Sequence, residues 1–309
     1  MQGDNLQLRE LRELLLDTAT GQSHISAASG MWLAGETLYV IADDELLLGV
    51  FSLQDTQPGR TLTIISGDLP KDGKSRKAAK PDFESLTCLP RCSRYPQGAL
   101  LALGSGSTEQ RMRGMLWPFN QRGELLSAPQ LFDLQPLYHP LAALVADLNI
   151  EGALVQGDCF KLWQRGNNQQ RQSAVIEYDL ADLFALIDAQ QHPLEVKPQR
   201  IDYYDLGEVD AVPLTFTDAF ALPDASCLFT AAAENTDNSY QDGECVAAAI
   251  GLIDTQRQLR WIKMVQPVYK IEGLSAKQVG EQLQIRVVSD ADNPNSPAKL
   301  LETYINYTL

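Results

Sequence analysis

The chain repeats one short motif five times, and this repeat constrains its fold more than any other feature. Each copy is an acidic or polar residue followed by a small residue and then an apolar one. The copies are Ser29-Gly30-Met31, Glu84-Ser85-Leu86, Glu151-Gly152-Ala153, Asp218-Ala219-Phe220 and Glu272-Gly273-Leu274. They lie 55, 67, 67 and 54 residues apart, somewhat more than the roughly 40 to 50 residues of common propeller repeats. The spacing indicates repeated units of one architecture that carry insertions.

Each motif opens a series of apolar runs with the composition of β-strands. The run that contains the motif is followed by a second, a third and, in four of the repeats, a fourth. The fourth runs span 61–69, 131–138, 200–208 and 259–266, and turn-rich or charged loops are expected at 54–60 and 70–80. Residues 179–187 have instead the apolar spacing of a short surface helix. We therefore expect one all-β domain over residues 1–309, a five-bladed β-propeller with four-stranded blades.

The last repeat reaches Leu309 without a fourth strand. Residues 6–16 stand just before the first motif, where such a strand belongs, so we predict that the N-terminal segment supplies it and closes the ring. The same segment also fits an amphipathic helix, because Leu8, Leu11 and Leu15 share a helical face. Ring closure favours the strand.

The five motif residues are expected to meet at one mouth of the central channel. The inner strand of each blade begins at the face where the second strand ends, since the two are antiparallel neighbours. Four of the five are carboxylates: Glu84, Glu151, Asp218 and Glu272. Carboxylates crowded on one axis repel each other, and a hard cation such as Ca²⁺ or Mg²⁺ would relieve the repulsion. The alternative is that each carboxylate accepts hydrogen bonds from a neighbouring blade and only holds the ring together.

The loops after the second strands supply further candidates, because they crowd the same face. Arg165 offers a planar guanidinium to an anionic ligand, with Asn167 beside it; otherwise it neutralises the acidic rim. A glycine-containing loop holds Ser105 and Ser107 and is followed by Arg111. This loop either admits an anionic group or forms a tight turn. These five residues are the candidate ligand-binding set.

Two acidic loop residues, Glu234 and Asp290, are candidate general bases for activating water. A basic cluster within 71–80 precedes Glu84 and is either a solvated loop or a phosphate-binding segment. The sequence has no phosphate loop and no dinucleotide fingerprint. Its three histidines, His24, His139 and His192, lie outside the rim loops, so no catalytic triad is indicated.

The charge balance excludes some classes of partner. The formal charge of −15, from 40 acidic and 25 basic side chains, disfavours nucleic acid and anionic membranes. No apolar run approaches the roughly 18 to 20 residues that span a bilayer, and residues 1–17 lack the apolar core of a signal peptide. The five cysteines have no second pair or histidine at zinc-site spacing. We therefore expect a soluble, cytoplasmic protein with reduced cysteines.

Seven short motifs are specific as a set: residues 80–86, 104–107, 148–153, 165–168, 176–180, 234–236 and 240–244. With them the chain resembles an uncharacterised bacterial family of five-bladed propellers, a domain of unknown function. More distantly, its acidic strand starts are similar to those of the phytase-like esterase and calcium-binding lactonase propellers. That resemblance implies metal-assisted hydrolysis, in which a cation polarises a phosphoryl or carbonyl oxygen and activates water. Ser29 stands where the first blade of those hydrolases has an acid.

The leading hypothesis is a propeller that binds a divalent cation and a small anionic ligand at the channel mouth. Glu84, Glu151, Asp218 and Glu272 are the expected metal ligands, and the reaction would be hydrolysis of a phosphoester or a lactone. The alternative is a non-enzymatic scaffold that grips another protein, with the motif carboxylates serving only the architecture.

Overall fold

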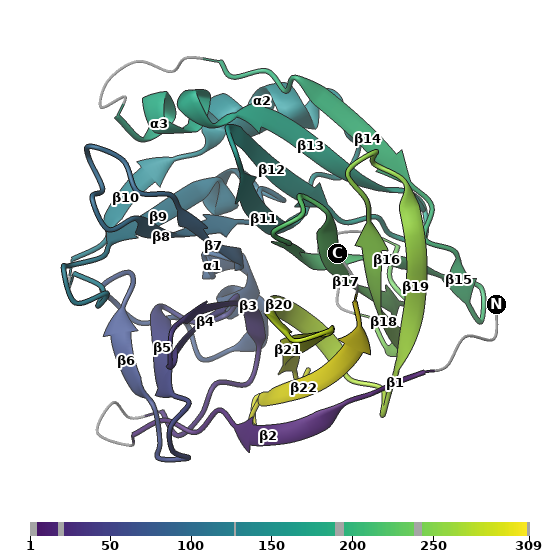
Figure 1. Cartoon of the computed structure of the whole chain (residues 1–309). Coiled ribbons are helices and arrows are strands. Elements are labelled where there is room, and N and C mark those ends of the chain that lie inside the picture. The colour runs from purple at the N-terminus through teal and green to yellow at the C-terminus, as the bar shows by residue number, and fades with distance from the viewer. Residues whose placement is uncertain (1–4, 18–21, 127, 189–194, 238–242, 308–309) are drawn as a thin grey trace.

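Five sheets stand around a central axis in the computed structural model, which describes residues 5–17, 22–126, 128–188, 195–237 and 243–307 (Figure 1). Blade 1 contains β3 (Ala28–Ala34), β4 (Thr37–Ala42), β5 (Leu47–Ser52) and β6 (Arg60–Thr63). Blade 2 contains β7 (Phe83–Leu89), β8 (Ala99–Gly104), β9 (Arg113–Pro118) and β10 (Gln130–Asp133). Blade 3 contains β11 (Ile150–Gln156), β12 (Cys159–Gln164), β13 (Ser173–Asp179) and β14 (Arg200–Tyr204). The five-bladed propeller predicted from the repeat is confirmed.

The last two blades share the N-terminal segment. Blade 4 contains β16 (Val212–Ala221), β17 (Cys227–Glu234), β18 (Cys245–Ile253) and β19 (Leu259–Gln266), with the short strands β15 (Glu208–Val209) and β1 (Leu6–Gln7) at its edges. Blade 5 contains β20 (Lys270–Val279), β21 (Gln282–Asp290), β22 (Lys299–Asn306) and β2 (Arg9–Glu13). Because β2 comes from the start of the chain and β20 to β22 from its end, this blade closes the ring.

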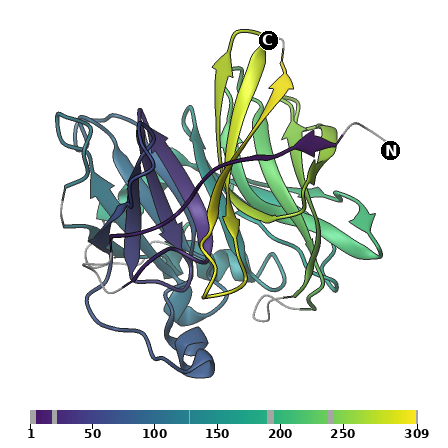
Figure 2. The same ribbon diagram turned by 90° about the horizontal axis from the view of Figure 1, so that it is seen from below.

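The N-terminal segment forms strands and not the alternative helix. After its parallel pairing with β19, the chain crosses to blade 5, where β2 pairs antiparallel with β22 (Figure 2). It then reaches blade 1, where Leu16 bridges Gly59. The Arg12 guanidinium donates to the backbone carbonyls of Ser52, Asp55 and Gln57 at 2.9, 3.1 and 2.6 Å. The segment therefore ties three blades together.

The core lies between neighbouring blades. All residues of β8 and β17 are buried, because both faces of a blade's middle strands contact other blades. Leu101 and Leu103 of β8, for example, share one apolar cluster with Leu162 and Ile176 of blade 3. Strands buried on both faces read as continuous apolar runs, which explains why the second run of each repeat was visible in the sequence.

In the described part of the chain, three α-helices lie outside the sheets: α1 (Gly73–Ala79), α2 (Gln135–Ala142) and α3 (Leu180–Asp188). The helix predicted at 179–187 is confirmed by α3. The expected loop at 70–80 is wrong in part, because the Asp72 carboxylate caps α1 by accepting a hydrogen bond from Ser75 N at 2.9 Å. The expected strand at 131–138 ends at Asp133, and α2, with a proline in its first turn, follows. Among the described helices, none is long and apolar enough to cross a bilayer.

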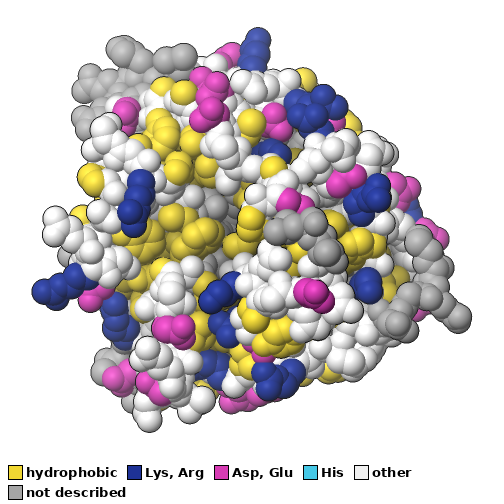
Figure 3. Space-filling view, viewed as in Figure 1, with side chains coloured by type: hydrophobic (Ala, Val, Ile, Leu, Met, Phe, Trp, Pro, Cys, Tyr) yellow, Lys and Arg dark blue, Asp and Glu magenta, His cyan; other side chains and the backbone are white. Residues whose placement is uncertain are grey.

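The two faces of the ring differ in character. On the face turned to the viewer in Figure 1, hydrophobic side chains gather around the central hollow (Figure 3). Half-buried Trp32 and Phe220, near the far ends of β3 and β16, have their ring centroids 6.3 Å apart. The inner strands begin at the other face, where α1 protrudes (Figure 2). His192 and residues 240–242, which the sequence analysis named, lie outside the described residues.

Candidate functional site

Each inner strand is irregular near its start, and the irregularity positions the motif residues. In β3, β7 and β11 one residue has no partner on the neighbouring strand: Ser29, Glu84 and Glu151 respectively. In β20 the pairing skips Glu272 and Gly273. A β-bulge of this kind bends the strand and redirects the side chain of the extra residue. The repeated motif is therefore the sequence signature of a bulge at the channel mouth.

Blade 4 corrects the predicted set. The residue skipped in β16 is Thr217, and Asp218 pairs with Thr230 one position further on. Asp218 thus stands at the position that Gly152 holds in blade 3 and Gly273 holds in blade 5, one residue after the bulge. A shift of one residue turns a side chain to the opposite side of the strand. Its Oδ2 accepts a hydrogen bond from Leu274 N of blade 5 at 2.7 Å. The structure therefore gives Asp218 the position of a link between blades and not of a channel ligand.

Replacing Asp218 with Ala is expected to destabilise the fold without changing any response to divalent cations. The substitution leaves the buried Leu274 N–H without its acceptor, which costs about 1–3 kcal/mol. Urea denaturation and calcium-dependent thermal shifts would check both halves of this prediction. Asp68→Ala, at an exposed position, serves as the charge-matched control. A loss of the calcium response in Asp218→Ala alone would restore the metal-ligand assignment.

A cavity of about 830 Å³ opens at the channel mouth where the bulges lie. Among the described residues, ten carboxylates line it: Asp43, Asp44, Asp82, Glu84, Asp147, Glu151, Glu234, Glu272, Asp290 and Asp292. Seven cationic side chains of the same described part accompany them: Lys71, Arg76, Lys77, Lys80, Arg111, Arg165 and Lys270. Eight of the predicted site residues belong to this lining, Glu84, Glu151, Glu272, Arg111, Arg165, Asn167, Glu234 and Asp290, whereas Asp218, Ser105 and Ser107 do not.

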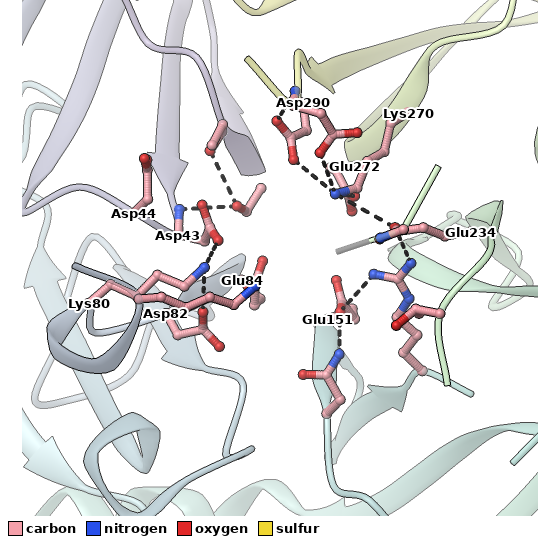
Figure 4. Close-up of a pocket in the computed structure, with 18 of the residues that line it drawn as sticks. Asp43, Asp44, Lys80, Asp82, Glu84, Glu151, Glu234, Lys270, Glu272 and Asp290 are labelled. Atoms are coloured by element: carbon pink, nitrogen blue, oxygen red, sulfur yellow. Dashed lines mark hydrogen bonds and ion pairs between the residues drawn. The ribbon is translucent and has the colours of Figure 1, made fainter. Parts of the chain in front are cut away.

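On the side of blades 1 and 2, buried cations sit among the carboxylates (Figure 4). Lys80 Nζ forms ion pairs with Asp43 and with Asp82, the latter at 2.8 Å. Arg111 pairs with Asp82 at 2.8 Å as well. One oxygen each from Asp43, Asp82 and Glu84 lie within 4.8 Å of one another, the one such acidic group among the described residues. This group, which we call the Asp43 cluster, has the oxygen donors of a hard-cation site.

The serines predicted to bind a ligand lie behind this wall. Ser105 Oγ donates to Asp82 Oδ2 at 2.5 Å, and Arg111 donates to Ser107 Oγ at 2.9 Å. Arg111 also donates to the backbone carbonyl of Lys77 at 2.9 Å, which joins blade 2 to α1. These contacts use Ser105, Ser107 and Arg111 to support Asp82 and α1.

On the side of blades 3 to 5, two cations bridge carboxylates of different blades. Arg165 contacts Glu234 at 2.5 Å and Glu151 at 3.3 Å. Lys270 Nζ lies 2.9 Å from Asp290, 3.6 Å from Glu234 and 3.8 Å from Glu272. Asn167 donates to Asp147 at 2.6 Å and shapes its own loop. The predicted anion partner, Arg165, is therefore engaged by two carboxylates of the protein itself.

Burial and mutual repulsion set the protonation of the carboxylates. Burial raises the pKa of Glu84 well above its usual range, and the neighbouring Glu151 carboxylate raises it further. Burial likewise raises the pKa of Glu151, against the opposing effect of Arg165, and that of Glu272, against Lys270. Burial would also raise the pKa of Glu234, but Arg165 and Lys270 outweigh it and lower that pKa to about 2. A carboxylate with so low a pKa is a poor proton acceptor at neutral pH.

The depressed pKa of Glu234 predicts a pH-dependent contribution to stability. Its pKa falls from 4.5 in the unfolded chain to about 2 in the folded one, so ionised Glu234 stabilises the fold above pH 4.5. This stability is lost as the pH falls from 4.5 toward 2. The free energy of unfolding of wild type minus that of Glu234→Gln should shrink over this window, whereas Glu208→Gln, at an exposed pair, should show little effect. A Glu234→Gln difference that stays constant down to about pH 3 would contradict the ion-pair account.

Sequence reasoning did not select Asp43, Asp82 or Lys270 as site residues, and it named Lys80 only as part of the basic cluster within 71–80. A signal was nevertheless present two positions before the motif residues, where Asp82, Asn149 and Lys270 precede Glu84, Glu151 and Glu272. Residues i and i+2 of a strand share one side, so both would face the channel mouth. Asn149 confirms the geometry by donating to Glu151 Oε1 at 2.6 Å.

No curated protein matches the chain. Among solved structures, glutaminyl cyclase from Myxococcus xanthus is 8% identical with a TM-score of 0.48, and the match covers 98% of this chain and 100% of that one. A luciferin-regenerating enzyme is 8% identical with a TM-score of 0.45, covering 96% and 94%. Hydrazine synthase from Kuenenia stuttgartiensis is 9% identical with a TM-score of 0.39, covering 93% of this chain and 65% of that one. Likenesses this distant do not indicate a shared activity. As its motifs predicted, the chain belongs to the family of unknown function DUF6929, which matches residues 24–305.

Proposed function

We propose that the protein binds a divalent cation, Ca²⁺ or Mg²⁺, together with a small anionic ligand in the channel-mouth cavity. The Asp43 cluster is the proposed cation site, so that Glu84 keeps the role expected from the sequence, while Asp43 and Asp82 take the place of Glu151, Asp218 and Glu272. The supporting observation is the convergence of three carboxylate oxygens to within 4.8 Å on the wall of a cavity where carboxylates outnumber cations.

The residues fit such an ion in spacing and charge. Calcium–oxygen distances are about 2.3–2.6 Å, so oxygens no more than 4.8 Å apart can share one ion. Lys80 Nζ pairs with both Asp43 and Asp82, and a bound ion would have to displace it. The lysine stem is long and flexible, which allows the ammonium to withdraw toward the cavity. Glu84 has no ion pair among the described contacts and is free to complete the site.

An anionic ligand would meet cationic side chains at the rim of the cavity. Lys71 is exposed and lines the cavity just before α1, and Lys77 lines it from α1 itself. A bound divalent cation would supply polarisation of a phosphoryl or carbonyl oxygen and a more acidic water, which is the chemistry of phosphoester and lactone hydrolysis. Within the chain, the raised pKa of Glu151 suits proton transfer near neutral pH better than the low pKa of Glu234.

A thermal-shift panel of Ca²⁺, Mg²⁺, Mn²⁺ and Zn²⁺ tests the cation site directly. At about 100 times its dissociation constant an ion adds roughly 2.7 kcal/mol, which corresponds to a rise of about 5 °C for a chain of this size. Glu84→Gln should weaken the response to Ca²⁺ or Mg²⁺, and the exposed Glu124→Gln should not. The absence of any shift with all four ions would refute the proposal. Phosphoester and lactone substrates are then assayed with the ion that binds.

The scaffold alternative has one specific observation in its favour. Lys80, Arg111, Arg165 and Lys270 already pair with most of the buried carboxylates, as structural ion-pair networks do. Under this alternative the carboxylates only join blades. Metal ions would then leave the melting temperature unchanged, while Glu151→Gln would lower it in metal-free protein.

A further inference from the structure

Three carboxylates face the centre of the cavity from three different blades: Glu84 from β7, Glu151 from β11 and Glu272 from β20 (Figure 4). We call them the floor carboxylates. Glu272 is only 4% exposed, and its Oε2 has no hydrogen-bond partner in the described part of the chain. The nearest cation to its other oxygen is Lys270, at 3.8 Å. A buried carboxylate that lines a cavity and keeps one oxygen unpartnered offers an acceptor to a partner from outside the chain.

One Mg²⁺ ion does not meet this need. Opposite ligands of one ion are separated by about 4.2 Å for Mg²⁺ and about 5 Å for Ca²⁺. The floor carboxylates do not form a set within 4.8 Å, because among the described residues the Asp43 cluster alone does so. They are nevertheless close enough that Glu151 raises the pKa of both Glu84 and Glu272. A positive partner that joins all three must therefore be wider than a bare Mg²⁺ ion.

We propose that the ligand of this cavity carries a guanidinium group, which binds between Glu84, Glu151 and Glu272. The inference rests on the proposed function, since it describes one end of the small ligand proposed above. A nitrogen cation holds carboxylate oxygens at about 2.8 Å from each N–H donor, and a guanidinium carries five donors in one plane. A guanidinium can therefore span carboxylates that one Mg²⁺ ion or one ammonium cannot.

The chain already uses both cation types beside the floor carboxylates. The Arg165 guanidinium reaches Glu151 at 3.3 Å, and the Lys270 ammonium lies 3.8 Å from Glu272. Neither fills the centre, because each is held more closely by Glu234 or Asp290. With its cationic end on the floor and its anionic end near Lys71 at the rim, the ligand would be zwitterionic.

The experiment compares three matched probes by calorimetry on chelator-treated protein at constant ionic strength. Butyrate carries only the anionic group, whereas 4-aminobutyrate and 4-guanidinobutyrate add an ammonium or a guanidinium at the other end. 4-Guanidinobutyrate is expected to bind roughly tenfold or more tightly than butyrate, and this preference should be lost in Glu272→Gln. Glu124→Gln, an exposed carboxylate replaced in the same way, should keep it.

Equal binding of the three probes, or no binding of any at millimolar concentration, would overturn the inference. So would a preference that survives in both Glu272→Gln and Glu84→Gln. Glu84→Gln removes a floor carboxylate for which no hydrogen bond or ion pair is described, and it covers the case in which Glu272→Gln fails to fold. The calorimetry uses metal-free protein, so it is independent of the thermal-shift panel. A thermal shift with a metal ion, combined with equal binding of the three probes, would refute this inference and leave the metal site standing. Probe preference without any metal response would refute the metal site alone.

Discussion

Replacing Arg165 with Leu is expected to lower the free energy of unfolding by about 3–5 kcal/mol. Arg165 is 10% exposed and pairs with Glu234 at 2.5 Å and Glu151 at 3.3 Å, whose side chains are 3% and 5% exposed. Leucine removes the charge and leaves two buried carboxylates without their main partner. Lys270, 3.6 Å from Glu234, compensates only one of them. The loss is large because an unpaired buried charge costs far more than the intact pair contributes.

Urea denaturation of Arg165→Leu and Arg171→Leu measures this difference. Arg171 pairs with Glu208 on the surface, where the side chains are 47% and 54% exposed, so its replacement should cost less than about 1 kcal/mol. Both variants remove one positive charge, so a difference between their free energies of unfolding reports the burial of the ion pair and not the change in net charge. Equal losses in the two variants would show that the cavity network contributes no more than an exposed ion pair.

Lys80→Met is expected to raise the affinity for Ca²⁺ by at least about tenfold. In the wild type the Lys80 ammonium competes with the ion, since it pairs with both Asp43 and Asp82. Methionine keeps an apolar stem of similar length and removes that competitor. The metal-free variant should also melt at a lower temperature, because the Asp43 carboxylate loses its close cation, and Ca²⁺ should restore the loss. Lys80 is buried, as Asp82 is, and this makes it unlike the other lysines of its segment.

Calorimetry with Ca²⁺ on wild type, Lys80→Met and Lys74→Met checks this expectation. Lys74 lies in α1 and is exposed outside the cavity lining, so its replacement makes the same change in net charge nearby. A similar gain in both variants would assign the effect to long-range charge. A loss of affinity in Lys80→Met would mean that the ion binds elsewhere and that Lys80 belongs to a purely structural network.

Much of the fold could be predicted because it is written in local patterns. The middle strands are buried on both faces, so β8 and β17 appear as continuous apolar runs. The bulges of β7 and β11 appear as an acidic residue before a small one, since the small residue packs against the next blade. A Cβ on Gly152, for instance, would lie 3.0 Å from the Cα of Asp218. The helices α1 and α2 were not predicted. The Asp72 cap of α1 is a short signal, and the charged composition of its segment favours a loop, while the composition of the α2 segment favours a strand.

The candidate site was predictable only in part. Glu84, Glu151 and Glu272 were named as channel residues from the repeat, and the structure places all three on the cavity wall. Asp218 was misplaced because Asp218-Ala219-Phe220 matches the motif but begins one residue too late. The bulged residue of this strand is Thr217. A strand alternates its side chains, so this single step separates a channel residue from a link between blades.

The sequence by itself determined the number of blades, the closing N-terminal strand and the acidic channel mouth, because each depends on residue types repeated along the chain. Only the tertiary structure decided which charges neutralise one another. Arg165 and Glu234 are 69 residues apart in the chain, and Lys80 and Asp43 are 37 apart, yet both pairs are in contact. Coulomb energy depends on separation in space and on burial, and closure of the ring sets both by packing one blade against the next.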